Sequence, residues 1–201
     1  MERKIKEILA SRTKNCLKVQ GLKRAAVLVP LFKKGDEYHI LFTKRTDIVE
    51  HHKGQISFPG GRQDQKDKDL LNTALREAQE EMGIKKEDVR LLGELDDSLT
   101  ATTDFCISPF VAFIPYPYPF QINPHEIEEV IEAPLLAFLD GDKFRQEVIV
   151  RNGDPFPVYF YQYQGHTIWG ATARILKQLL DLLPEEGEKQ NTEDRSQNSG
   201  E

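Results

Sequence analysis

The stretch "ALREAQEEMGI" (residues 74–84) places three glutamates within two helical turns and then reaches a glycine. Glu77 and Glu81 are four residues apart, so their like charges face each other at a spacing that destabilises a helix by about 0.2–0.5 kcal/mol. Glu80 and Glu81 also fall in the last turn, where the negative end of the helix dipole favours basic residues. A feature outside this helix must therefore compensate for the charge.

Helical geometry places the three glutamates beside the apolar stripe of the helix. At about 100° per residue, Glu77, Glu80 and Glu81 share one arc of roughly 100°. The neighbouring arc holds the apolar residues Leu71, Leu75, Ala78 and Met82. The carboxylates thus lie where the helix meets a sheet, and the spacing supports two interpretations equally. One is a solvated acidic face; the other is a site for Mg²⁺ or Mn²⁺, which prefer oxygen ligands and also bind phosphates.

Two further features accompany the glutamates. Arg76 lies four residues before Glu80 and could hold that carboxylate in a bidentate pair, or form a surface ion pair worth under about 1 kcal/mol. The segment "FPGGR" (58–62) stands upstream, and Gly60 and Gly61 allow the backbone to approach a ligand closely. A Gly-Gly pair usually marks a turn, but its place before an acid-rich helix favours a binding role.

Composition narrows the class of protein. The chain has 201 residues, 39% of them hydrophobic and 30% charged, which is typical of one soluble globular domain. Cys16 and Cys106 form no CxxC pair and indicate neither a disulfide framework nor a zinc site. The absence of a long apolar run and of a secretory signal predicts a cytoplasmic protein that does not bind membranes. The net charge of −6 argues against nucleic-acid binding, and the sequence leaves a homodimer open.

Hydrophobic periodicity and turn residues predict an α/β fold with a mixed β-sheet covered by helices on both faces. Helices are expected over residues 1–20, 70–82 and 171–183, with a short helical turn after residue 134. Strands are expected over residues 24–32, 38–45, 89–95, 105–115 and 128–134, and an Asn-Gly turn predicts a hairpin within 147–163. Residues 46–69 are expected to form a long loop. Residues 1–183 then form one domain, and 184–201 a disordered tail.

The longer segment "GGRQDQKDKDLLNTALREAQEEMGI" (60–84) resembles the Nudix box. The matching residues are Arg76, Glu77, Ala78, Glu80, Glu81, Gly83 and Ile84. The first half of the box departs from the pattern, because Gly61 lies one residue too far from Arg76 and Asp67 stands in place of the first Glu. This stretched form is similar to the coenzyme A pyrophosphatase branch of the Nudix superfamily.

A second segment, "LFTKRTDIVEHHKGQISFPGG" (41–61), resembles the upstream signature of the same branch. The matching residues are Thr43, Arg45, His52, Gly54, Gln55, Phe58 and Pro59. Thr46 and Val49 are mild departures, and the resemblance covers roughly residues 24–180.

The resemblance implies a Nudix α/β/α sandwich and Mg²⁺- or Mn²⁺-dependent hydrolysis of a nucleoside diphosphate linked to another group. In this branch the substrate is coenzyme A or a derivative, which is cut to 3′,5′-ADP and 4′-phosphopantetheine. Two alternatives stay open: a different nucleoside diphosphate derivative, such as ADP-ribose or a damaged nucleotide, and a non-catalytic ligand-binding module.

The resemblance and the residue chemistry together assign roles. Glu77, Glu80 and Glu81 are the expected metal ligands, Arg76 orients a glutamate, and Glu81 is the first choice for the general base. Outside candidates for the base are Glu126, Glu128 and Glu129. The expected substrate contacts are Arg45, Lys44, His52, Gln55, Gly60 and Gly61. Trp169, Tyr159, Tyr161 and Tyr163 could stack on adenine, although aromatic residues in strands more often pack in the core.

Overall fold

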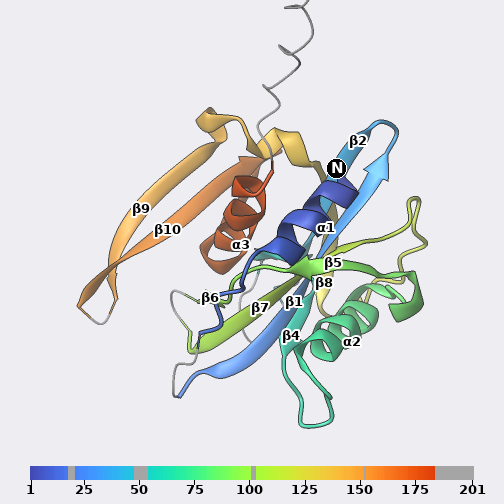
Figure 1. Cartoon of the computed structure of the whole chain (residues 1–201), viewed down its shortest axis with the longest axis horizontal. Coiled ribbons are helices and arrows are strands. Elements are labelled where there is room, and N and C mark those ends of the chain that lie inside the picture. Colours follow the sequence, from blue (N-terminus) through green and yellow to red (C-terminus); the bar gives the residue numbers. More distant parts are fainter. Residues whose placement is uncertain (18–20, 48–53, 101–102, 152, 184–201) are drawn as a thin grey trace, which may run out of the picture.

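The structure is a computed structural model that describes residues 1–17, 21–47, 54–100, 103–151 and 153–183. These residues form a mixed α/β fold, which confirms the predicted fold class (Figure 1). The predicted substrate contact His52 and the predicted tail 184–201 lie outside the described residues.

A mixed sheet forms the centre of the molecule. Its eight strands are β1 (Lys23–Lys34), β2 (Glu37–Arg45), β3 (Ile56–Ser57), β4 (Gly60–Arg62), β5 (Arg90–Glu94), β6 (Ser98–Leu99), β7 (Phe105–Phe113) and β8 (Ile127–Pro134). β1 pairs with β7 in parallel and with β2 and β4 in antiparallel orientation. β8 extends the sheet beyond β2.

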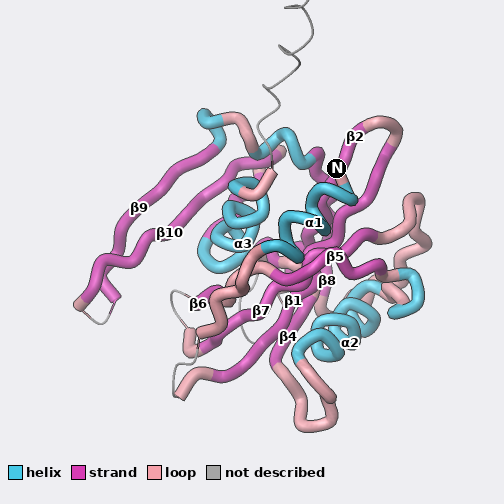
Figure 2. The backbone as a smooth tube through the Cα atoms, viewed as in Figure 1, coloured by secondary structure: helices cyan, strands magenta, loops and turns pink. Residues whose placement is uncertain are grey.

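Within the described residues, three helices and a smaller sheet lie around this centre. The helices are α1 (Glu2–Ser11), α2 (Leu70–Met82) and α3 (Gly170–Asp181), and 3₁₀ turns span Lys86–Asp88, Leu135–Phe138 and Gly141–Lys143. The smaller sheet consists of β9 (Phe144–Arg151), β10 (Asp154–Tyr163) and β11 (His166–Trp169). The β9–β10 hairpin extends away from the body of the molecule (Figure 2). None of the helices in the described ranges combines the length and apolar character needed to cross a bilayer.

Alternation along β1 creates two cores, because successive side chains of a strand point to opposite faces. Ala26 and Leu28 pack in the cluster that contains the buried side of α2. Val29 and Leu31 pack in the cluster that contains α1 and α3. The predicted arrangement with helices on both faces is therefore confirmed.

The boundaries of α2 follow from its sequence. Asp69 caps the first turn by accepting a hydrogen bond from the N–H of Asn72. Gly83 ends the helix in the left-handed conformation at φ 70°, which a glycine adopts without steric strain. The prediction of a helix over 70–82 is confirmed.

Two predictions about irregular segments are wrong. The expected loop 46–69 contains β3 and β4, because the Gly60–Gly61 backbone pairs with β1 despite its low strand propensity. The first helix ends at Ser11, not near residue 20. The chain after Ser11 instead hydrogen-bonds to the turn that follows β5, where Asn15 exchanges hydrogen bonds with Asp96 and Asp97.

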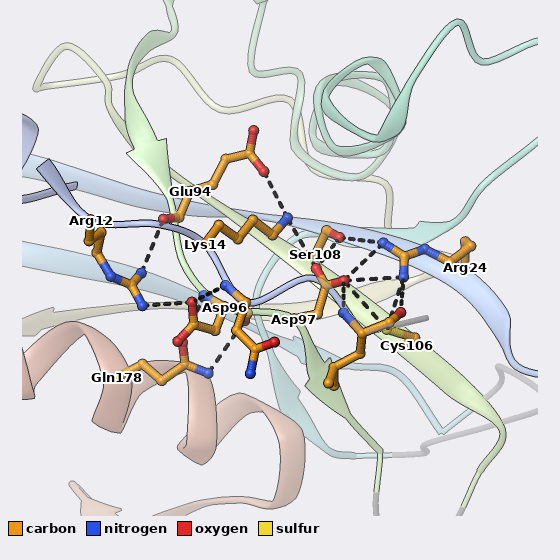
Figure 3. Close-up of polar contacts among 11 residues, drawn as sticks. Arg12, Lys14, Arg24, Glu94, Asp96, Asp97, Cys106, Ser108 and Gln178 are labelled. Carbon is orange, nitrogen blue, oxygen red and sulfur yellow. Dashed lines mark hydrogen bonds and ion pairs between the residues drawn. The ribbon is translucent and has the colours of Figure 1, made fainter. Parts of the chain in front are cut away.

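Asp97 is the centre of the polar cluster that holds this N-terminal segment (Figure 3). Its side chain is fully buried, and the hydroxyl of Ser108 donates to it at 2.6 Å. Lys14 Nζ lies 3.0 Å and Arg24 Nη2 lies 3.2 Å from its two oxygens, and the N–H of Leu17 donates at 3.1 Å. Burial alone would raise the pKa of Asp97, but the hydrogen bonds from Ser108 and Lys14 and the charges of Lys14 and Arg24 outweigh it and lower the pKa.

The substitution Asp97→Asn should lower the free energy of unfolding by about 2 kcal/mol at neutral pH, because charge-assisted hydrogen bonds are lost. The native pKa of Asp97 is lowered, so its stabilisation is present above the ordinary carboxyl value of 3.8 and is lost as the pH falls through the native value. Urea denaturation of wild type and variant at several pH values measures this. Asp36→Asn, at a fully exposed side chain, should have little effect; equal losses for the two variants would contradict the role of the cluster.

Candidate active site

Glu81 lies buried between three elements of the fold. It projects from α2 and is 2% exposed. The N–H of Gly60 in β4 donates to Oε2 at 3.2 Å, and Arg45 Nη1 at the end of β2 lies 3.4 Å from Oε1. Burial raises the pKa of Glu81 to about 8; Arg45 and Gly60 oppose this rise, and the charges of Glu77 and Glu126 add to it. Burial therefore outweighs the stabilisation that Arg45 and Gly60 give to the ionised carboxylate.

The two glycines of β4 permit this arrangement. A Cβ atom on Gly61 would lie 2.5 Å from the carboxyl carbon of Glu77, and one on Gly60 would lie 2.3 Å from the carbonyl oxygen of Ala26. Gly60 also has a φ of 154°, which side-chain-bearing residues rarely adopt. The close approach at these glycines is therefore to Glu77 and to the backbone of β1. Burial also raises the pKa of Glu77, although Arg76 lowers it in part.

Arg76 organises the acidic side chains. Its Nε and Nη2 atoms hold Asp67 in a bidentate pair at 2.9 and 3.0 Å. Its Nη1 atom lies 2.9 Å from both Glu77 and Glu80. The predicted bidentate pair with Glu80 is therefore wrong. Asp67 accepts the bidentate pair from Arg76, and the Thr73 hydroxyl also donates a hydrogen bond to it. The guanidinium of Arg76 holds the pKa of Asp67 well below its usual range.

A cavity of about 790 Å³ adjoins the buried carboxylate. It is lined by Arg45 and Gly60, both of which contact Glu81, and by Glu126. Its apolar wall includes Val27, Ile56, Phe58, Ile107, Trp169 and Ile175. The volume suits a small organic ligand.

Two basic residues, Lys23 and Arg62, also line this cavity. The register places Arg62 opposite Ala25, so Lys23 and Arg62 are diagonal neighbours on one face of the sheet. The sequence did not single out this pair, because the pairing of β4 with β1 was not predicted.

The structure brings together only part of the predicted substrate contacts. Arg45, Gln55, Gly60 and Gly61 line the cavity. Lys44 is not among the cavity-lining residues, and its Nζ lies 2.7 Å from Glu128.

The candidate general bases and the candidate adenine-stacking residues also divide into those that line the cavity and those that do not. Glu126 lines the cavity, whereas Glu128 and Glu129 are exposed on β8. Trp169 lines the cavity and stacks on Phe160. Tyr161 packs in the core that contains α3, and Tyr159 and Tyr163 pack against it.

The carboxylates fit a hard divalent cation by their chemistry. In the part of the chain that the structure describes, no three His, Cys, Asp or Glu side chains already form a metal-binding cluster. Glu77 and Glu80 both pair with Arg76 Nη1 at 2.9 Å, so a cation held by these two carboxylates would lie close to the guanidinium. Burial raises the pKa values of Glu77 and Glu81 even though Arg76 and Arg45 oppose the rise, and a divalent ion would stabilise the ionised form of both carboxylates. The ligand set Glu77, Glu80 and Glu81 stays a prediction.

Residues 22–152 match the model of the NUDIX domain family. The chain belongs to this family. An uncharacterized Nudix hydrolase, NudL, from Photorhabdus laumondii subsp. laumondii is 39% identical over 161 residues, which cover 80% of this chain and 85% of that protein. An uncharacterized NudL from Yersinia pestis is 38% identical over 161 residues, which cover 80% of each chain. The protein is thus a Nudix hydrolase, an enzyme of nucleoside diphosphate derivatives, and Nudix hydrolases generally use divalent metal ions.

A solved MutT/nudix family protein from Enterococcus faecalis has the same fold. Its TM-score is 0.51 at 16% sequence identity, and the match covers 81% of this chain and 62% of that chain. The likeness supports the predicted Nudix sandwich.

The contact between Gly61 and Glu77 generates a prediction about cation binding. Gly61→Ala would displace the Glu77 carboxylate, so Mn²⁺ should raise the melting temperature of this variant less than that of the wild type. Thermal unfolding with and without Mn²⁺ measures the effect. Gly141→Ala is the matched control, because a Cβ there meets open space. If Mn²⁺ raised the melting temperature of both variants equally, Glu77 would not be a ligand of the cation.

Proposed function

We propose that this Nudix hydrolase cuts the diphosphate of coenzyme A or its derivatives to 3′,5′-ADP and 4′-phosphopantetheine. The upstream segment 41–61 supports this substrate, because it resembles the signature of the coenzyme A pyrophosphatase branch. The proposal includes Mg²⁺ or Mn²⁺ as the ion, a single domain over residues 1–183, a cytoplasmic location and a homodimer.

The observation that carries the proposal is the composition of the cavity. Arg45 lies between the buried Glu81 and the cavity, so an anion at Arg45 lies beside the acidic site. Lys23 and Arg62 provide a second cationic pair, and an apolar wall lines the rest. Coenzyme A combines a diphosphate, a separate 3′-phosphate and a long pantetheine arm, which match these three features.

Each residue has a distinct part in the proposed reaction. Glu77 and Glu81, with Glu80, would hold the divalent ion. When bound, such an ion neutralises phosphate oxygens and lowers the pKa of a bound water. Arg45 would bind the diphosphate, and Arg76 would keep the glutamates in position. Glu81 is the proposed general base, and Glu126 is the alternative because it also lines the cavity.

Product analysis tests the substrate. The protein is incubated with Mg²⁺ or Mn²⁺ and with coenzyme A, ADP-ribose and dinucleoside polyphosphates, and the products are identified by mass spectrometry. Formation of 3′,5′-ADP supports the proposal. Cleavage of ADP-ribose alone would assign a different Nudix specificity.

Glu81→Gln should lower turnover of coenzyme A at least about 100-fold, since a positioned base or metal ligand is lost. Circular dichroism should show an intact fold, because glutamine has nearly the same shape. Glu87→Gln, on the exposed 3₁₀ turn Lys86–Asp88, is the matched control. A wild-type rate in Glu81→Gln would exclude Glu81 from the reaction.

The double variant Lys23→Ala/Arg62→Ala should raise KM for coenzyme A about tenfold, because a charge-assisted contact is worth roughly 1.4 kcal/mol or more. KM for dephospho-coenzyme A, which lacks the 3′-phosphate, should change little. Steady-state kinetics with both substrates measures this, and Lys33→Ala, on the same strand but outside the cavity lining, is the control. An equal rise for both substrates would contradict recognition of the 3′-phosphate by this pair.

A further inference from the structure

The outer strand of the small sheet has an apolar free edge. The strand order β11-β10-β9 leaves β9 paired on one side only within the described residues. Val148, Ile149 and Val150 in this strand are 61%, 36% and 77% exposed. Proteins usually protect such an edge with charged residues, proline or a covering segment, because it can pair with another strand.

The prolines of β10 show which backbone groups of β9 face this edge. Pro157 lies opposite Val148 and Pro155 opposite Val150. Proline has no N–H, so it occupies positions of an antiparallel pair that do not exchange hydrogen bonds. The carbonyl of Pro157 accepts a hydrogen bond from Arg174 Nη2 of α3, so it points away from β9. The N–H and C=O groups of Val148 and Val150 therefore face the free edge.

The sequence of β9 is complementary to itself in an antiparallel register that also pairs its exposed valines. We propose that β9 pairs with β9 of a second copy of this chain, about a two-fold axis at Ile149. Val148 then lies opposite the partner's Val150, and both present their hydrogen-bonding groups to each other. Glu147 lies opposite the partner's Arg151, so each pair of opposed charges is complementary. A register centred on Val148 would instead place Arg145 opposite the partner's Arg151.

This pairing gives a closed dimer with an isologous interface. The two small sheets join into one continuous sheet in which each β9 becomes an internal strand. The exposed valines gather on one face of the joined strands, and Ile149 meets the partner's Ile149 on the other. The dimer does not depend on the identity of the substrate.

A charge exchange tests the register. Analytical ultracentrifugation of the wild-type protein should show a concentration-dependent dimer. Glu147→Arg alone and Arg151→Glu alone should each shift the protein toward monomer, because like charges then face each other. The double variant Glu147→Arg/Arg151→Glu should restore the dimer. The proposal would be overturned if the wild-type protein sedimented as a monomer at every concentration. It would also be overturned if the double variant formed no more dimer than either single variant.

Cysteine cross-linking locates the two-fold axis independently. In a Cys16→Ser background, which removes the exposed native thiol, Ile149→Cys places two thiols opposite each other in a pair that exchanges no hydrogen bonds. Cα atoms in such pairs are about 4.5 Å apart, within disulfide range, so mild oxidation should give a covalent dimer. Val148→Cys is the matched control and should stay uncross-linked, because it faces the partner's Val150. Cross-linking of Val148→Cys in place of Ile149→Cys would overturn this register.

Discussion

The burial of the Glu81 carboxylate is the constraint on which the rest of the site depends. A carboxylate that is 2% exposed needs partners, and it has the N–H of Gly60 and the guanidinium of Arg45. These two contacts fix α2 relative to β4 and β2. They also place the guanidinium-bearing side chain of Arg45 at the wall of the cavity. Burial raises the pKa of Glu81 to about 8, so the two contacts only partly stabilise its ionised form.

Some features of the structure that depend on residues close together in the sequence were predicted correctly. Apolar periodicity and the glycine at position 83 predicted the helix over 70–82 correctly, and the structure adds the cap at Asp69. Helical spacing likewise predicted that Glu77 and Glu81 border the apolar stripe of the helix, and the structure shows Glu81 buried. Such features are read from residues that lie within a few positions of each other.

The features that were not predicted depend on contacts between residues far apart in the sequence. β4 is made of two glycines and an arginine, and only its pairing with β1 makes it a strand. That pairing brings Arg62 near Lys23 across a long separation in sequence. Arg76 illustrates the same limit: helical spacing favoured Glu80 as its bidentate partner, but the fold brings Asp67 into a better position.

The small sheet links the proposed dimer to the cavity. Trp169 ends β11, lines the cavity and stacks on Phe160 of β10. β10 in turn pairs with β9 from Asp154 to Tyr161. The wall that Trp169 provides is therefore supported through β10 by β9, whose outer edge is unpaired among the residues that the structure describes. Pairing of β9 with a second copy would replace water at that edge with backbone hydrogen bonds and so stiffen the hairpin. Because α3 follows β11 directly and supplies Ile175 to the same wall, this stiffening would act on the apolar side of the cavity and leave the carboxylates of α2 untouched.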